Sequence, residues 1–535
     1  MCASVSEWAN FQQWCLDFSE VQIALDLSRS GLTQEDLAAF EQPCTDALAS
    51  MAKLEAGALA NPDEQRQVGH YWLRNPELAP TREIAEDIRI AWAAIDEFTQ
   101  AVHSATLVSA TGSRFRNLLL VGIGGSALGP QLVHHAFRSP DDPLKIWFLD
   151  NTDPDGFDRV REDLGAGLAE TLVLVVSKSG GTKETRNGML EAQAWFAEAG
   201  FDFAKQAVAV TGAGSELDRV AESQGWLRRF PMWDWVGGRT SELTVVGLLP
   251  AALQGVDWRQ LVEGAREMDV LTRNPNLARN PALLLAVAWH LAGEGRGTRA
   301  LVVLPYKDRL ELFGRYLQQL VMESLGKAHD LAGTVVHQGL TVYGNKGSTD
   351  QHAYVQQLRE GPDDFFATFL AVKEDRQGEG LEVEPGITSG DYLHGFWLGT
   401  RAALTEAGRR SISLVLDRLT PRTLGALIAL FERTVGCYAT LIGINAYHQP
   451  GVEAGKVAAN EVLRLQQALL DVLHEKPEQR WSAEQLAEAL EQPQSAETVF
   501  HLLEHLAANR RLVREAGQNP FDATFRVSGP EAQAA

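Results

Sequence analysis

The sequence predicts an α/β protein with two αβα units on parallel sheets, a helical N-terminal segment and a small winged-helix-like C-terminal appendage. Short apolar runs alternate with glycine-rich or polar turns and helical stretches, first from Asn117 and again from about Thr298. Runs of this kind are typical of parallel strands that helices cover on both faces. A chain of 535 residues is also long for one hydrophobic core. The expected divisions are 1–84, 85–255, 275–470 and 471–535.

The first segment, residues 1–84, is expected to contain short helices. Several of its aromatic residues recur at spacings of three and four, which would place them on one helical face. These residues are Trp8, Phe11, Trp14 and Phe18. After Pro80, a longer helix is expected over residues 81–103 and leads into the first αβα unit.

The two αβα units are recognised by their strand candidates. In the first unit these candidates are 117–121, 145–149, 171–176 and 206–210. In the second unit they are 299–304, 335–343 and 366–372, with a long helix through Gly326 after the first of them. Helical stretches between the strands supply the crossovers that parallel strands require.

The C-terminal appendage, residues 471–535, has a different texture. Ser482 is expected to cap a helix with Gln485 at its third position, and Ser495 to cap another. A small hairpin strand is expected at 521–527. The appendage has 11 acidic and 6 basic residues, a net charge of −5, whereas a nucleic-acid-binding wing should be basic. We therefore expect a role in packing or oligomerisation.

The charge of the whole chain limits its partners. The net charge is −22 and the isoelectric point is about 5.1, so that nucleic acid and anionic membranes are poor default partners. A small anionic substrate stays compatible with this charge, because a local set of N–H groups, hydroxyls and a few cations can bind phosphate on an acidic protein.

The cysteines and the N-terminus favour a cytoplasmic protein. None of the four cysteines belongs to a Cys-x-x-Cys pair, and so few in a long chain do not make a disulfide framework. They are Cys2, Cys15, Cys44 and Cys437. The first twenty residues lack a basic and an apolar signal region. No run of about 18 uninterrupted apolar residues predicts a membrane span.

A glycine turn at 122–126, Gly-Ile-Gly-Gly-Ser, follows the first strand and precedes a helix. Glycines let a backbone approach a ligand, and the N-terminus of a helix attracts anions. A tight turn without a ligand is an equally good interpretation. A dinucleotide site is the third, although Ala127 stands where the strict G-x-G-x-x-G pattern has its last glycine.

A second turn, Ser177-Lys178-Ser179-Gly180-Gly181-Thr182, is more informative. It offers three hydroxyls, two glycines and an ammonium group between a buried strand and a helix. Phosphate oxygens need several donors at once, so the turn favours phosphate binding over a polar surface loop. The order of its residues does not match the G-x-x-x-x-G-K-[ST] loop of ATP-binding proteins.

Five other residues are weaker candidates when each is taken alone. Arg239 follows paired glycines and would reach an anion in a cleft, or else form a surface salt bridge. Gln319 and Glu323 share a helix face, and Glu323 would act as a general base if partly buried, although most such glutamates are solvated. His352 lies in a glycine-rich polar loop, where catalytic residues often occur. Lys456 is in a similar setting.

Together these motifs resemble the glucose-6-phosphate isomerase family. The matching segments occur in the family's order over roughly residues 85–460, and the most specific is Met322-Glu323-Ser324 followed by Gly326-Lys327. The resemblance implies two sugar-isomerase domains of αβα type, a homodimer, and a step of glycolysis and gluconeogenesis in the cytoplasm. It implies no metal and no redox cofactor.

The resemblance also implies roles for individual residues. Glu323 corresponds to the base between C1 and C2, and Arg239 to the group that stabilises the enediolate. His352, supplied across the dimer interface, and Lys456 correspond to residues that open the sugar ring. The sugar phosphate would be bound by Gly125, Ser126, Ser177, Lys178, Ser179, Thr182 and Gln319.

Two rival hypotheses stay open on the sequence alone. Cys2 follows the initiator methionine, as in glucosamine-6-phosphate synthase, but the next residues lack that family's glycine-rich start and too few residues precede the first unit for a glutaminase domain. The second rival hypothesis is a sugar-phosphate sensor whose C-terminal appendage reads DNA. A sensor requires only the phosphate-binding loop, and the acidic tail also argues against it.

Overall fold

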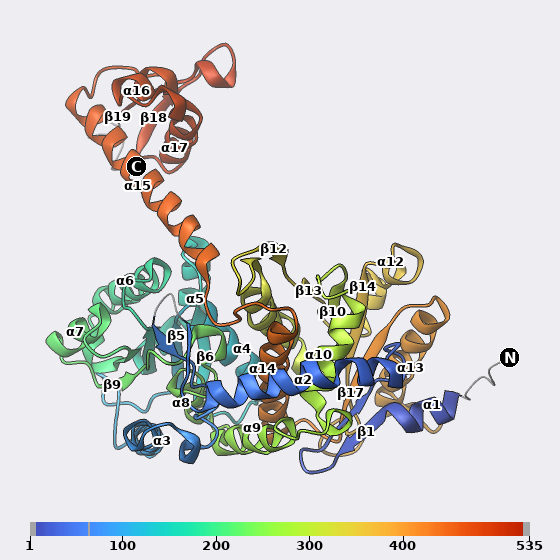
Figure 1. Cartoon of the computed structure of the whole chain (residues 1–535). Helices are drawn as coiled ribbons and strands as arrows, with labels where there is room; N and C mark the ends of the chain where they lie inside the picture. Colours follow the sequence, from blue (N-terminus) through green and yellow to red (C-terminus); the bar gives the residue numbers. More distant parts are fainter. Residues whose placement is uncertain (1–6, 62–64, 528–535) are drawn as a thin grey trace. The chain divides into compact units, whose positions relative to one another are not determined.

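Two sheets form the frame of the first of two compact units in the computed structural model (Figure 1). The structure describes residues 7–61 and 65–527, without the side chains of 452–454 and 456. The first unit extends to His448, and the second begins at Gln449. The first expected αβα unit, 85–255, lies in this first unit, whereas the second, 275–470, extends beyond its end at His448.

The first sheet has five parallel strands in the order β6-β5-β7-β8-β9. Their bounds are β5 (Asn117–Val121), β6 (Lys145–Leu149), β7 (Thr171–Ser177), β8 (Ala207–Thr211) and β9 (Arg228–Pro231). The first four confirm the expected strands. β9 was not predicted, because its sequence Arg-Arg-Phe-Pro has no apolar run.

Helices cover both faces of this sheet. Leu118 and Leu120 of β5 belong to one hydrophobic cluster, whereas Leu119 and Val121 belong to another. The alternation agrees with the period of two in a strand and explains why the strand is apolar throughout. The surrounding helices are α3 (Arg82–His103), α4 (Leu128–Phe137), α5 (Pro154–Leu164), α6 (Lys183–Glu198), α7 (Glu216–Ser223) and α8 (Val245–Gln254).

The second sheet has six strands in the order β1-β2-β17-β14-β10-β13. β10 pairs in parallel with β13 and β14, and β14 with β17. β2 is antiparallel to β17, and β1 to β2. The bounds are β1 (Cys15–Phe18), β2 (Ile23–Asp26), β10 (Ala300–Tyr306), β13 (Val342–Tyr343), β14 (Phe365–Val372) and β17 (Ser411–Leu416).

The N-terminal segment differs from the expectation of helices alone. Helix α1 (Glu7–Trp14) stops before Phe18, which lies in β1. Trp8 is 65% exposed, whereas Trp14 and Phe18 are buried, so the four aromatic residues do not form one helical face. Pairing with the edge of the second sheet outweighs the local helical period. Farther along, α2 (Gln34–Glu55) and α3 are helical, and Thr81 caps α3.

The segment after β10 also differs in detail. The helical stretch starts at Phe313 as α11 (Phe313–Leu317) and continues as a π-helical segment, η8 (Gln318–Glu323). The single strand expected at 335–343 is two short ones, since β12 (Val335–Gln338) pairs with β11 (Lys327–His329) and β13 joins the main sheet. Gly339 lies between them and separates the two pairings.

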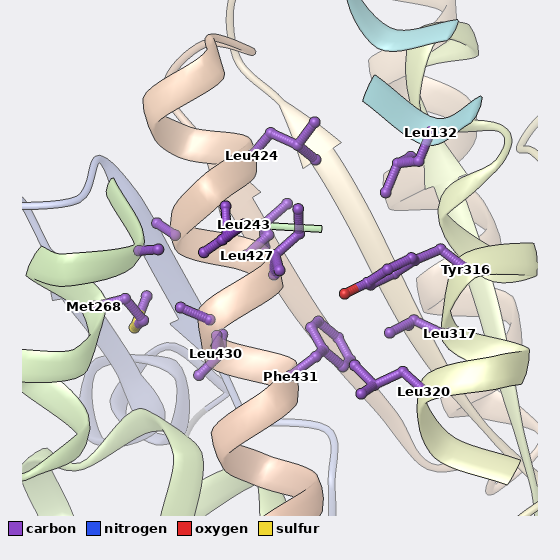
Figure 2. Close-up of a cluster of buried hydrophobic side chains, with 14 of the residues drawn as sticks. Leu132, Leu243, Met268, Tyr316, Leu317, Leu320, Leu424, Leu427, Leu430 and Phe431 are labelled. Atoms are coloured by element: carbon purple, nitrogen blue, oxygen red, sulfur yellow. The ribbon is translucent and has the colours of Figure 1, made fainter. Parts of the chain in front are cut away.

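Helix α14 (Pro421–Leu441) is the centre of the core and packs on α2, α9 (Trp258–Thr272) and α10 (Pro281–Ala292). Within the described residues, it is also the helix long and apolar enough to cross a membrane, but 89% of that window is buried in the fold. Figure 2 shows Leu427 and Phe431 of α14 facing Tyr316 and Leu320. This contact fixes the helical segment that ends at Glu323.

A buried ionic cluster joins α2, α9 and α14. Arg74 donates to Asp269 and Glu432, and Arg433 donates to Glu55 and, at 3.2 Å, to Asp269. Both arginine side chains are at most 1% exposed. Because each charge is paired inside the core, removal of one partner would leave another charge uncompensated.

The second unit contains α15 (Pro450–Glu475), α16 (Ala483–Ala489), α17 (Ala496–Ala508) and the hairpin β18 (Leu512–Glu515) to β19 (Thr524–Val527). The capping box of Ser482 and Gln485 is confirmed. Ser495 precedes α17, but its side chain makes no capping hydrogen bond. The division expected at 470 falls inside α15. The winged-helix comparison stays a prediction.

Candidate active site

Three short helical turns meet at the ends of the first sheet and the α11 segment. They are η2 (Gly124–Ser126), η5 (Gly238–Thr240) and η8. A Cβ atom on Gly125 would lie 2.0 Å from the carbonyl oxygen of Gly238, so only glycine permits this approach. The hydroxyl of Ser241 donates to the carbonyl of Gly125 at 3.2 Å. The predicted glycine turn is thus held against the turn that carries Arg239.

Arg239 is buried in this site, with 7% of the residue exposed. Its guanidinium donates to the carbonyls of Ala446 at 3.2 Å and His448 at 3.4 Å, and to the hydroxyl of Ser324 at 3.4 Å. It also lies 3.7 Å from a carboxylate oxygen of Glu323. Burial lowers the pKa of Arg239, and Glu323 opposes that shift. These fixed donors place a positive charge beside the carboxylate.

Glu323 ends the π-helical segment, and its side chain is 20% exposed. Wider turns of this kind are frequent at functional sites. Gln319 lies on the same segment, and its amide nitrogen is 3.3 Å from the place of a Cβ atom on Gly124. The structure therefore brings Glu323, Arg239 and Gln319 together near the glycine turn.

The polar turn after β7 is folded on its own side chains. The hydroxyl of Ser177 accepts from the N–H of Gly180 at 3.2 Å and donates to Thr182 at 3.4 Å. The hydroxyl of Ser179 accepts from the N–H of Gly181 at 3.2 Å. Thr182 precedes α6 without a side-chain capping bond, so its hydroxyl does not occupy the first N–H groups of that helix. Such N–H groups bind anions.

Lys178 links this turn to the segment before Arg239. Its ammonium group donates to the carbonyls of Asp234 at 3.0 Å and Val236 at 3.1 Å, and lies 3.6 Å from the Asp234 carboxylate. In this structure Lys178 is thus a bridge between two loops of the site. Its charge still adds to the positive potential near the turn.

His352 is not joined to this group by any contact among the described residues. His352 is exposed at the end of η9 (Thr349–His352), and its side chain makes no hydrogen bond there. Asp350 accepts from the backbone and side chain of Asn345, at 3.0 and 3.2 Å, and from Tyr354 at 2.5 Å. These bonds fix the loop. Lys456 belongs to α15 in the second unit, and its side chain lies outside the described residues.

Sequence reasoning missed the role of two buried groups near the site. Lys327 is 5% exposed, and burial lowers its pKa to about 8. Glu242 is 2% exposed, and its carboxyl packs between Gly129 and Gly247 without a hydrogen-bond partner among the described residues; burial raises its pKa. In the sequence, Lys327 was marked only as the last residue of the family motif that contains Glu323.

Metal ligands are not grouped in the described part of the chain, where no three His, Cys, Asp or Glu residues are placed to hold an ion. The clustered groups are instead one carboxylate, one buried guanidinium and a polar turn rich in hydroxyl and N–H donors. This arrangement suits proton transfer on a phosphorylated substrate that gains negative charge during the reaction.

Comparison with known proteins gives consistent matches over the chain. The family model described as phosphoglucose isomerase matches residues 26–384 and 401–474. A glucose-6-phosphate isomerase of Synechococcus elongatus is 58% identical over 516 residues, which is 96% of this chain and 97% of that protein. One of Geobacter sulfurreducens is 59% identical over 503 residues, covering 94% and 95%.

A solved structure gives the same result for the fold. The crystal structure of a glucose-6-phosphate isomerase from Chlamydia trachomatis superposes with a TM-score of 0.77 at 26% identity, covering 86% of this chain and 91% of that one. A hypothetical protein from Thermus thermophilus superposes with a TM-score of 0.68 at 29% identity, covering 82% and 99%.

Proposed function

The chain belongs to the phosphoglucose isomerase family, and we propose that it interconverts glucose 6-phosphate and fructose 6-phosphate at the site where η2, η5 and η8 meet. The observation that carries the proposal is the pair of Arg239 and Glu323, 3.7 Å apart, with the carboxylate partly exposed and the guanidinium buried. Aldose–ketose isomerisation needs a base at the C1–C2 bond and a positive charge near the oxygen that becomes negative.

Glu323 is the base in this mechanism. Its carboxylate accepts the proton from C2 of open-chain glucose 6-phosphate, and the C–H electrons form the C1–C2 double bond while negative charge moves to O1. The carboxylic acid then returns the proton to C1, and the hydroxyl proton of O2 passes to O1, which leaves a ketone at C2. The positive charge of Arg239 stabilises the negative charge of the enediolate. The guanidinium is already held in place by its hydrogen bonds to the carbonyls of Ala446 and His448.

The substrate phosphate binds in the polar turn. The hydroxyls of Ser177, Ser179 and Thr182 and the first N–H groups of α6 supply the donors, and Lys178 adds positive charge. Gly125, which packs against Gly238, and Ser126, which follows it in η2, are the proposed contacts of the sugar chain. Gln319 contacts the sugar hydroxyls from the same helical segment as the base.

Ring opening requires groups that this arrangement lacks, and His352 and Lys456 are the proposed ones. His352 is exposed on a fixed loop, and its neighbour Gln351 donates to the carbonyl of Phe396 at 3.4 Å. Phe396 and Tyr392 are themselves exposed on α13 (Ser389–Glu406). Exposed apolar side chains mark interaction surfaces, so a homodimer that uses this surface would bring His352 to the site of its partner.

The proposed location is the cytoplasm. The three described cysteines, Cys15, Cys44 and Cys437, are free thiols, as expected in a reducing compartment.

The test is turnover of fructose 6-phosphate to glucose 6-phosphate by the purified protein, beside Glu323→Gln and the exposed control Glu41→Gln on α2. We expect rapid turnover in the parent and in the control, and a loss of about 10²–10⁴-fold in Glu323→Gln. A folded parent that binds the sugar phosphate without turning it over would favour the sensor. Turnover that survives in Glu323→Gln would leave the isomerase but assign the base elsewhere.

A further inference from the structure

The ammonium group of Lys327 is enclosed beside the Arg239–Glu323 pair. Lys327 begins β11 and is 5% exposed, although lysine side chains are almost never fully buried unless they are paired. Its Nζ donates to the carbonyl oxygen of Glu323 at 2.7 Å. We propose that Lys327 is a positioning residue of the isomerase reaction, which holds the end of η8 and supplies positive charge next to the reacting carboxylate.

Two cations hold two consecutive residues, the base itself and the residue that follows it. Arg239 donates to the hydroxyl of Ser324, and Lys327 donates to the carbonyl of Glu323. A displaced base loses much of its effect, since misplacement by about 1 Å from a distant change can reduce a rate about 10²-fold. The contact of Lys327 therefore acts on the geometry of the carboxylate without touching the substrate.

The charges around Lys327 are unbalanced before the substrate enters. Arg239 from η5 and Glu323 from η8 are the charged groups that act on it, and its pairing neighbour on β12 is the neutral Gln338. Two buried cations thus face one carboxylate. Burial, and to a smaller extent Arg239, lower the pKa of Lys327 to about 8, while Glu323 raises it. If the proposed function is right, an enediolate anion would balance the excess positive charge.

A purely structural role makes the opposite prediction for stability. A lysine that serves only to stabilise the fold should lower the melting temperature when it is removed. A buried charge retained for function should not, because replacement of buried ions by apolar groups of similar size is often neutral or stabilising. Lys327→Met has nearly the same length without the charge, so it separates the two roles.

The experiment measures kcat and KM for fructose 6-phosphate between about pH 6 and 10 for the parent, Lys327→Met and Lys327→Arg. We expect the parent's kcat/KM to fall above about pH 8, because burial lowers the pKa of the Lys327 ammonium to about 8 in the free protein. Lys327→Arg should keep its kcat/KM to higher pH, since a guanidinium stays charged. At about pH 7, Lys327→Met should lose about 10²-fold in kcat, with KM and melting temperature nearly unchanged. The control is Lys373→Met, whose exposed ammonium pairs with Asp417.

The proposal fails if folded Lys327→Met has a kcat within about threefold of the parent's. It also fails if the activity of Lys327→Arg falls at the same alkaline pH as that of the parent. If neither variant folds, the parent decides alone, because a kcat/KM that stays level between about pH 7 and 9 contradicts a titrating Lys327. A parent without any isomerase turnover would instead refute the proposed function on which this inference rests.

Discussion

The guanidinium of Arg239 lies 3.7 Å from the carboxylate of Glu323, although 84 residues separate them in the chain. Arg239 does not depend on that carboxylate for its position. Its nitrogens donate to the carbonyls of Ala446 and His448 and to the hydroxyl of Ser324. The pair is therefore preorganised, with the cation fixed by the fold and the carboxylate left partly open to a ligand.

Arg239→Lys should lose activity while the protein stays folded. A guanidinium reaches several acceptors at once in a planar fork, whereas an ammonium group on a shorter side chain cannot hold the same partners. We expect kcat to fall by about 10²–10³-fold. Steady-state kinetics checks this beside Arg266→Lys, a control whose exposed side chain pairs with Glu263. An Arg239→Lys protein within about threefold of the parent would exclude Arg239 from the reaction.

Thr182→Val tests the phosphate-binding turn. The substitution keeps the shape of the side chain and removes one hydroxyl next to the N-terminus of α6. Hydrogen bonds to charged groups contribute about 1.5–3 kcal/mol, so KM should rise by about ten- to a hundredfold with a smaller change in kcat. Inhibition by inorganic phosphate should weaken in parallel. An unchanged inhibition constant for phosphate would place the phosphate elsewhere.

Mixed dimers test whether His352 acts across an interface. A dimer of one Glu323→Gln chain and one His352→Gln chain has one site with both native residues if His352 comes from the partner subunit. Co-expression of the two inactive chains should then restore roughly a quarter of the parent activity per chain. Co-expression of two Glu323→Gln copies is the control. If His352 acts within its own chain, the mixture stays as inactive as its components.

Asp269→Asn should destabilise the core without a direct effect on the chemistry. Asp269 is the buried partner of Arg74 and Arg433, and its loss leaves both cations short of negative charge. We expect a cost of about 3–5 kcal/mol, measured by urea unfolding. Asp96→Asn is the matched control, because its pair with Arg259 is exposed and should contribute less than about 1 kcal/mol. Equal effects of the two substitutions would contradict the account of the buried cluster.

The sequence predicted the parts of the fold that are set by local patterns. Strands β5 and β6 were predicted to the residue, because a continuous apolar run ends at a turn on either side. Strands β1 and β2 were not, since β2 joins the sheet by pairing with β17, a contact between residues almost four hundred positions apart, and β1 follows it at the edge. Local periodicity carries no information on such a partner.

For the candidate site, the sequence likewise predicted the reactive side chains but not the contacts that hold them. Glu323, Arg239 and Gln319 have side chains that suit the chemistry, and the structure brings them together. The carbonyls that hold Arg239 were not predictable, because every residue has one and its partner lies 207 residues away. Lys327 was overlooked as a contributor because sequence spacing does not reveal burial or the bond to a main-chain oxygen.

The most direct test of Glu323 as the base is hydrogen exchange at the substrate carbons in heavy water. NMR would follow deuterium entering C2 of glucose 6-phosphate and C1 of fructose 6-phosphate with the parent and with Glu323→Gln. The account predicts exchange by the parent and a loss of about 10²–10⁴-fold in Glu323→Gln, with phosphate binding unchanged. Exchange by Glu323→Gln at the parent's rate would contradict the assignment of this carboxylate as the group that moves the proton.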